Sequence, residues 1–191
     1  TGDSYASILQ NVYGIDVSNN SIERTKILLS LMALTAGEQL QCDNLNLFVD
    51  NTLSFDFNGL APIRNYGGFD LVIGNPPYVR AKHIDEASKL LLHRWQVART
   101  GNADLYLPFF EIGLSILNEN GMLGYITVNS FFKSVNARGL RKFIQSNQFS
   151  IKILNFGQEL IFKKKLAYTC LAFLSKRKSV GIEYAKVSSK D

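Results

Sequence analysis

The chain has 191 residues, 46% of them hydrophobic, which is enough apolar material for the core of one compact domain. No apolar run reaches the roughly 18 to 20 residues that a membrane span needs, and the N-terminus lacks a secretory pattern, so we expect a soluble, cytoplasmic protein with no membrane partner. The net charge is +5, Cys42 and Cys170 lie far apart, and His83 and His93 lack metal-binding spacing, so we expect free thiols and no metal site.

Short apolar runs alternate with longer helical patterns along the chain. The runs are bounded by Gly, Asn, Asp or Ser on at least one side, which is typical of buried strands, and lie at Asn11–Ile15, Leu45–Val49, Phe69–Ile73, Met122–Val128, Ile151–Phe156 and Tyr168–Leu174. Apolar residues at helical spacing predict helices at Ser21–Thr35, Ala103–Leu117 and Ala137–Gln145. The segment Asn118–Gly121 is predicted to end the second helix.

This alternation predicts an α/β fold with a doubly wound, mostly parallel sheet, in a single domain over residues 1–191. Such a sheet binds ligands beyond the carboxyl ends of its strands, so a site should follow a strand directly. The less regular stretch Ala81–Asn102 is long enough for a partly helical lid. From Val180 onward we predict one more extended segment, and residues 180–191 are a candidate for the start of a following domain.

The tetrapeptide Asn75-Pro-Pro-Tyr78 follows the predicted strand Phe69–Ile73 directly. An amine attached to an aromatic ring is a poor nucleophile because its lone pair is delocalised into the ring. Two acceptors on its two hydrogens would hold the nitrogen in a more tetrahedral geometry. The side-chain carbonyl of Asn75 and the backbone carbonyl of Pro76 can be these acceptors, and their dipoles would stabilise positive charge on the nitrogen.

The rest of the tetrapeptide suits the same role. The prolines restrict φ, and Pro77 has no N–H to satisfy, so the loop can hold a backbone carbonyl toward a ligand. Tyr78 offers a flat ring on which an extruded base can stack, worth roughly 1–3 kcal/mol, which helps to offset the cost of unstacking that base. The alternative is a Pro-Pro turn that ends a core strand beside an exposed tyrosine.

The loop resembles that of the amino-group methyltransferases with an Asn-Pro-Pro-Tyr motif, and within them the adenine-N6 DNA methyltransferases of restriction-modification systems. Nearly the whole chain carries the resemblance, and its motifs are similar in order and spacing to the fused type II restriction-methylase branch: Asn75–Arg80, Gly101–Tyr106, Gly121–Ser130 and Ile161–Cys170. The resemblance implies a Rossmann-like sheet, S-adenosylmethionine as cofactor, and methyl transfer to a flipped-out adenine in double-stranded DNA. It also implies a target-recognition domain elsewhere in the full-length protein.

Three residues are candidates for binding the cofactor. Asp16 closes a predicted strand, where a carboxylate can accept hydrogen bonds from both ribose hydroxyls of a nucleoside, although an aspartate there also serves as a turn or helix cap. The resemblance implies that Asp50 bonds the amine of the cofactor's adenine and that Phe109 packs on the face of that adenine. At helical spacing with its apolar neighbours, Phe109 also fits a plain core position.

The final third of the chain carries most of the positive charge. Residues 1–130 hold 8 Lys/Arg and 13 Asp/Glu, net −5, whereas residues 131–191 hold 13 and 3, net +10. The resemblance places Phe162 against the flipped base, and Lys163, Lys164 and Lys165 would then contact phosphates without reading sequence. The alternative is a hairpin with a buried Phe162 and a solvated charge run.

The chain departs from the family pattern at its beginning. Family members carry an acidic, glycine-rich turn after their first sheet strand, and this sequence starts at Thr1-Gly2-Asp3 without one, so we expect a domain truncated at both ends that lacks its first strand. Such a fragment should bind the cofactor poorly and be inactive by itself. Two alternatives stay open: an inert DNA-binding or assembly module, and an enzyme of the same loop type acting on RNA or on release-factor glutamine.

Overall fold

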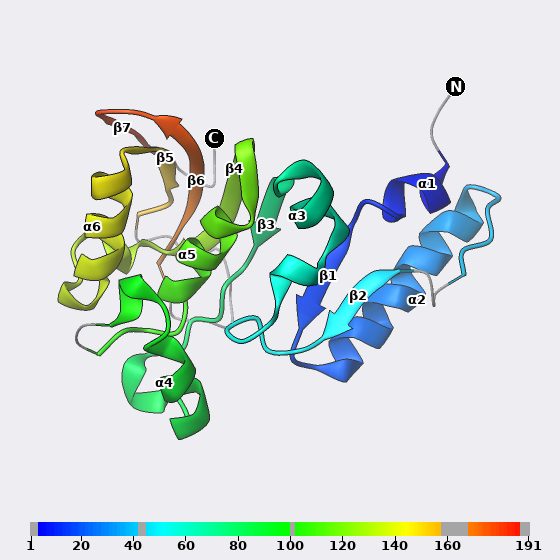
Figure 1. Cartoon of the computed structure of the whole chain (residues 1–191), viewed down its shortest axis with the longest axis horizontal. Helices are drawn as coiled ribbons and strands as arrows, with labels where there is room; N and C mark the ends of the chain where they lie inside the picture. The colour runs from blue at the N-terminus through cyan, green and yellow to red at the C-terminus, as the bar shows by residue number, and fades with distance from the viewer. Residues whose placement is uncertain (1–3, 42–44, 100–101, 158–167, 188–191) are drawn as a thin grey trace. The chain divides into compact units, whose positions relative to one another are not determined.

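A computed structural model describes residues 4–41, 45–99, 102–157 and 168–187 (Figure 1). The chain divides into two compact units, Thr1–Phe55 and Asp56–Asp191. Within the described ranges, no helix is both long and apolar enough to cross a membrane.

The first unit is a small parallel sheet with helices beside it. It contains α1 (Tyr5–Leu9), β1 (Tyr13–Asp16), α2 (Asn19–Thr35) and β2 (Asn46–Val49). The two strands pair in parallel, with Asp16 opposite Val49, and α2 begins after Ser18, whose hydroxyl accepts a hydrogen bond from the Ser21 amide at 3.3 Å. Both strands and the long helix lie within a few residues of their predicted positions. Because the strands are parallel, their two carboxyl ends lie at one edge.

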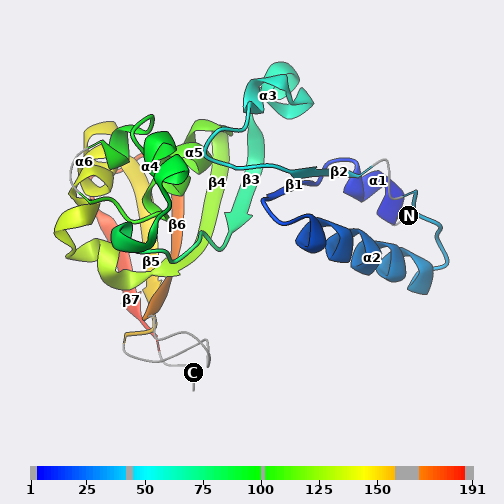
Figure 2. The ribbon, with the colours of Figure 1, turned by 90° about the horizontal axis from the view of Figure 1, so that it is seen from below.

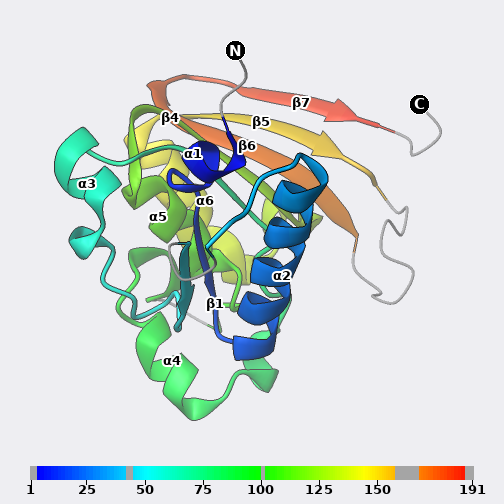
Figure 3. The same cartoon turned by 90° about the vertical axis from the view of Figure 1, so that its right-hand side faces the viewer.

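The second unit is built on a mixed sheet. Its strands are ordered β3-β4-β6-β5-β7; Figure 2 shows them side by side, and Figure 3 shows β6, β5 and β7 from another side. Their bounds are β3 Phe69–Gly74, β4 Leu117–Val128, β5 Phe149–Asn155, β6 Thr169–Lys178 and β7 Ile182–Lys186. Among these described strands β6 alone runs against its neighbours, since β3 is parallel to β4 and β7 is parallel to β5. The predicted mostly parallel sheet is confirmed.

Two helices cover one face of this sheet and enclose the core with it (Figure 2). They are α5 (Leu107–Ser115) and α6 (Arg138–Asn147). The fully buried Phe110 of α5 lies 5.4 Å from the ring of Tyr125 and 5.5 Å from that of Phe131. The shorter elements of the unit are η2 (Phe57–Gly59), α3 (Ala61–Tyr66), η3 (Ala81–His83), α4 (Glu86–Leu92), η4 (Gln96–Ala98), η5 (Asn129–Phe132) and η6 (Val135–Ala137).

Two boundaries differ from the sequence prediction. Helix α5 begins at Leu107 rather than Ala103, because the preceding residues are held in a turn and an extended segment by bonds to the loop after β3, and Pro108 then suits the first helical turn. Strand β4 begins at Leu117, so the segment predicted to end a helix lies within a strand. Gly121 allows this because a Cβ there would stand 2.6 Å from the carbonyl oxygen of Phe69 on the neighbouring strand.

Candidate active site

The loop Asn75–Tyr78 leaves the carboxyl end of β3 beside the end of β4. The parallel register puts Gly74 opposite Tyr125, so the loop passes the last residues of β4. The Tyr78 hydroxyl donates a hydrogen bond to the carbonyl oxygen of Ile126 at 3.2 Å. One end of the Tyr78 ring is therefore tied to β4, and the ring is half-buried.

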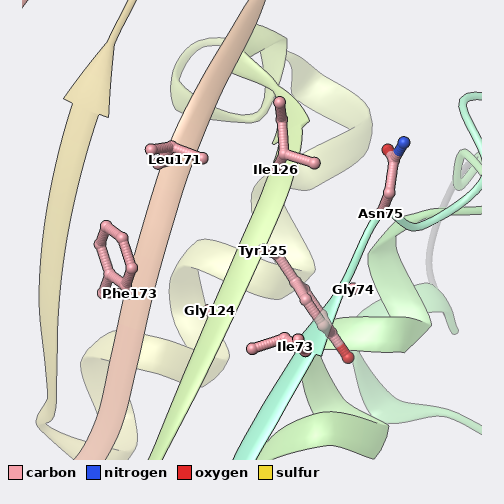
Figure 4. Close-up of a pocket in the computed structure, with 8 residues that line it drawn as sticks. All are labelled: Ile73, Gly74, Asn75, Gly124, Tyr125, Ile126, Leu171 and Phe173. Carbon is pink, nitrogen blue, oxygen red and sulfur yellow. The ribbon is translucent and has the colours of Figure 1, made fainter. Parts of the chain in front are cut away.

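The two oxygens proposed as acceptors face no internal donor. Asn75 is exposed and projects beyond the end of β3 in Figure 4. Across the residues that the structure describes, no hydrogen bond reaches the side-chain oxygen of Asn75 or the backbone oxygen of Pro76. Pro77 differs, because its carbonyl accepts from the Val79 amide at 2.9 Å. The loop thus closes a turn without a described donor on either acceptor oxygen, and of the two residues Asn75 is exposed whereas Pro76 is buried.

Tyr125 packs against Gly74, the residue that precedes the loop. A Cβ added to Gly74 would lie 3.1 Å from the Tyr125 ring, so only glycine lets β3 pass the ring without displacing it. The Tyr125 hydroxyl donates to the carbonyl oxygen of Phe109 in α5 at 3.0 Å. Burial raises the pKa of Tyr125 above its usual range, so it stays a neutral donor. Tyr125 therefore contacts both the residue before Asn75 and the backbone of Phe109.

A second anchor comes from the segment before α5. The Ala81 amide donates to a carboxylate oxygen of Asp104 at 2.9 Å, and the Leu105 amide donates to the Val79 carbonyl at 2.9 Å. These two bonds join the two ends of the segment that contains η3, α4 and η4. This segment is partly helical, as predicted for Ala81–Asn102. Asp104 was not among the candidate site residues. It lies in the motif Gly101–Tyr106, so the sequence contained a signal that could have identified it.

Burial raises the pKa values of Tyr78 and of Cys170. Burial raises the pKa of Tyr78 to about 12, with a smaller contribution from Cys170, and burial raises the pKa of Cys170 to about 12. Both groups are therefore protonated at neutral pH. Tyr78 can keep donating its hydrogen bond to β4, which fixes the ring without adding charge.

A hollow of about 510 Å³ lies beside Asn75 on the sheet surface. Asn75 and Tyr125 are the two lining residues whose side chains carry a polar group, and Figure 4 shows the apolar side chains along β4 and β6. The lining consists of Ile73, Gly74, Asn75, Gly124, Tyr125, Ile126, Leu171 and Phe173.

In the first unit, Asp16 and Asp50 lie together at the carboxyl edge of β1 and β2. The Asp50 amide donates to the Asp16 carbonyl at 3.1 Å. One carboxylate oxygen of Asp16 accepts from the Ser18 amide at 2.7 Å, and one of Asp50 accepts from the Asn51 amide at 2.6 Å. Both side chains are exposed, and neither makes a second bond within the described part of the chain. Each carboxylate is thus oriented by one oxygen and offers the other.

Phe109 is the less buried of two neighbouring phenylalanines on α5. Phe110 is fully buried, whereas Phe109 is half-buried, so the core of the unit is filled by Phe110. The proposed contact of Phe109 with a cofactor stays a prediction. Phe162, Lys163, Lys164 and Lys165 lie outside the described residues.

Curated relatives of the chain are restriction-modification proteins. The type II restriction enzyme and methyltransferase RM.Eco57I of Escherichia coli is 30% identical over 198 residues, which cover 92% of this chain and 20% of that protein. The type II methyltransferase M.BstVI of Geobacillus stearothermophilus is 45% identical over 80 residues, 41% of this chain and 14% of that protein. The chain spans a quarter or less of the length of such relatives.

Solved structures confirm the Rossmann-like methyltransferase fold. The type IIL restriction-modification enzyme MmeI, solved in complex with DNA, matches 95% of this chain and 26% of its own with a TM-score of 0.68 at 14% identity. A Listeria monocytogenes protein assigned to the class I S-adenosylmethionine-dependent methyltransferases matches 93% and 49% with a TM-score of 0.62 at 19% identity.

The family model described as Eco57I restriction-modification methylase matches residues 10–162. This range contains both aspartates, the Asn75–Tyr78 loop and helix α5. It confirms the resemblance to the fused restriction-methylase branch. The chain therefore belongs to the Eco57I restriction-modification methylase family.

Proposed function

We propose that the chain is the catalytic core of a DNA methyltransferase that transfers a methyl group from S-adenosylmethionine to the N6 amine of a flipped-out adenine, within a restriction-modification system. One observation carries the proposal. The Asn75 side-chain oxygen and the Pro76 carbonyl oxygen stand at the carboxyl edge of β3 with no donor on either of them among the described residues.

The two oxygens give the amine its reactivity. Each accepts one amine hydrogen, which draws the nitrogen out of the plane of the ring and frees its lone pair for attack. Their dipoles stabilise the positive charge that grows on nitrogen, and because they are fixed in advance little reorganisation is needed. Both oxygens act as hydrogen-bond acceptors and do not take up a proton. The proton leaves the methylated nitrogen for solvent after transfer.

Tyr78 holds the base, because its hydroxyl is already tied to the Ile126 carbonyl and its ring is half-exposed for stacking. Phe162 would contact the same base, with Lys163, Lys164 and Lys165 on nearby phosphates. A double-stranded DNA substrate must extrude the adenine before Asn75 can reach its amine.

The residues present fit a nucleoside cofactor. Asp16 and Asp50 are adjacent exposed carboxylates, each with an oxygen left over after its backbone bond, which suits ribose hydroxyls and an adenine amine. Phe109 offers a half-buried ring for an adenine face. When bound, S-adenosylmethionine supplies a methyl group on a sulfonium, and the sulfur keeps the electron pair of the broken bond while the amine lone pair forms the new one.

Two further findings support DNA as the substrate. The relatives are named as restriction enzymes and methyltransferases, and the structure of MmeI was solved in complex with DNA. The basic final third of the chain also favours a polyanion over a protein substrate. A recognition domain for the target sequence would lie elsewhere in the full-length protein.

The test is methyl transfer by the full-length gene product. Labelled S-adenosylmethionine would be incubated separately with duplex DNA, RNA and a release factor, and digested products would be separated to identify the methylated base. We expect N6-methyladenine in the DNA and no label elsewhere. Label in RNA or on glutamine would replace the proposed substrate, and no transfer to any of the three would favour an inert binding module.

A further inference from the structure

Two connections leave the carboxyl ends of the neighbouring strands β3 and β4, next to Asn75. They are residues 75–116 and 129–148, and together they carry 9 Lys/Arg against 4 Asp/Glu, so 9 − 4 = +5. Seven of the cations are exposed, and no ion pair joins any of them to a carboxylate in the described ranges. These seven, the cationic rim, are Arg80, Lys82, Arg94, Arg99, Lys133, Arg138 and Lys142.

Each acidic side chain of the same connections makes a described hydrogen bond or ion pair. Asp85 caps α4 by accepting from the Ser88 amide at 2.9 Å, and Glu86 pairs with Lys89 at 2.6 Å. Asp104 and Glu111 accept backbone amides at 2.9 Å each, from Ala81 and Val97 respectively. The carboxylates therefore do not neutralise the cationic rim through any described ion pair.

The two connections are packed against each other, which gives the cationic rim a fixed frame. A Cβ at Gly139 would lie 2.4 Å from the Val97 carbonyl oxygen, so the start of α6 touches η4, and Arg138 and Arg99 flank this contact. Arg141 donates to the carbonyls of Phe131 at 2.7 Å and Ser134 at 2.8 Å, which holds the turn that carries Lys133.

The opposite edge of the same two strands carries two exposed carboxylates, with Lys176 of the neighbouring strand β6 beside one of them. Asp70 near the start of β3 and Glu119 near the start of β4 are both exposed. Asp70 accepts from Asn118 at 2.7 Å, and Glu119 lies 3.7 Å from the Lys176 ammonium. β3 and β4 themselves contain no Lys or Arg, so the positive charge beside Asn75 comes from the connections that follow these two strands.

We propose that the cationic rim is a docking surface for the phosphate backbone of the DNA strand whose base is presented to Asn75. Exposed Arg and Lys on a fixed frame fit phosphates, which position a duplex without reading its sequence. The inference rests on the proposed function, and it adds phosphate contacts from η3, η4, η5 and α6 to those expected from Lys163–Lys165.

The test compares two charge-matched double variants of the 191-residue chain. Lys133→Gln/Arg138→Gln removes two rim charges, and Arg64→Gln/Arg177→Gln removes two exposed charges outside the two connections. Binding to a fluorescent duplex of mixed sequence is measured by anisotropy over a salt series from about 20 to 200 mM. We expect the slope of log K against log salt to become shallower by about 1.8 in the rim variant, or about 0.9 per lost contact, and to be unchanged in the control.

Other outcomes would overturn the inference. No detectable binding by the wild type at the lowest salt, or equal slopes for the two double variants, would exclude a rim that docks phosphates. Circular dichroism of both variants checks that each is folded. A failed binding test does not by itself contradict the proposed function. If the full-length protein still makes N6-methyladenine, the proposed function stands and only the inference about the cationic rim is wrong. A chain that prefers an RNA duplex at the same salt would redirect the surface to RNA.

Discussion

The loop Asn75–Tyr78 of the second unit and the aspartate pair of the first unit hold their oxygens in different ways. Both present oxygens beyond the carboxyl ends of parallel strands. Asp16 and Asp50 are oriented by their own hydrogen bonds, since each uses one carboxylate oxygen on a nearby backbone amide. Asn75 accepts no described bond, and the backbone around it is constrained instead by two prolines and by the ring beneath Gly74.

This difference suits the two chemical tasks. A carboxylate has two oxygens, so one can be spent on orientation while the other meets a ligand hydroxyl or amine. A side-chain amide has a single oxygen, and an internal donor on it would compete with the substrate. The loop is therefore expected to govern the rate of methyl transfer, and the aspartates are expected to govern cofactor affinity.

The largest effect should come from Asn75→Ala in the full-length protein. Loss of one preorganised acceptor typically lowers kcat by about 10²–10³. Cofactor affinity should be unchanged, because the substitution leaves Asp16 and Asp50 intact. Single-turnover methyl transfer and calorimetric titration with S-adenosylmethionine measure the two quantities. Asn65→Ala, at an exposed asparagine in α3, is the matched control and should leave both unaltered. Near-normal turnover by the Asn75 variant would refute its role.

The opposite pattern should follow Asp16→Asn. A hydrogen bond to a charged group contributes about 1.5–3 kcal/mol, so the cofactor dissociation constant should rise by about 10- to 100-fold while kcat at saturating cofactor stays close to wild type. Asp56→Asn controls for lost orientation, since Asp56 also accepts the amide two residues ahead, from Asn58 at 3.0 Å. If both variants weakened binding equally, the effect would be structural and the two regions would not divide their tasks.

Local patterning could place the loop and Asp16 directly after strands, whereas Asp50 became a candidate through the family resemblance. The strand runs before Asp16 and Asn75 are bounded by turn residues, and apolar runs alternate with helical patterns along the chain. Local patterning does not predict the contacts that hold the loop in place. The contact of Tyr125 with Gly74 and the bond from Ala81 to Asp104 join residues far apart in the chain, and nothing in local patterning encodes them.

The start of α5 and β4 show the same limit. Ala103 reads as helical by spacing, but tertiary bonds from the segment before Leu107 to Val79 and Ala81 override that preference. Gly121 reads as a helix stop, yet it serves close approach to Phe69 within a strand. In both cases a non-local contact outweighed a local signal.

Burial of the Cys170 thiol and of two tyrosines predicts that the free energy of unfolding falls at high pH. The Cys170 thiol has its pKa raised by burial from 9.0 to about 12. Between these values the unfolded chain releases a proton that the folded chain keeps, so the free energy of unfolding falls as pH rises, by up to about 1.4 kcal/mol per pH unit for this group. Denaturant unfolding at a series of pH values measures the fall.

The variant Cys170→Ala isolates this group. Its stability should stay level just above pH 9.0 and decline only where the buried tyrosines begin to matter, above their ordinary value of 10.0. Tyr78 and Tyr106, both raised to about 12, then lower stability in the wild type and the variant alike. Identical curves for the two proteins from the start of the series would mean that the thiol is accessible to water in the folded state.

The smallest effect tests whether Tyr125 acts through Phe109 or through the loop Asn75–Tyr78, both of which lie in the second unit. Tyr125→Phe keeps the ring under Gly74 and removes the bond to the Phe109 carbonyl, a net loss of about 1 kcal/mol. If Phe109 packs on the cofactor's adenine, KM for S-adenosylmethionine should rise by up to about five-fold with kcat kept. Tyr184→Phe, which loses a comparable bond to Asn155 at 2.8 Å, should lower stability without moving KM. A lowered kcat with unchanged KM would instead assign Tyr125 to the loop alone, because its ring supports the residue before Asn75.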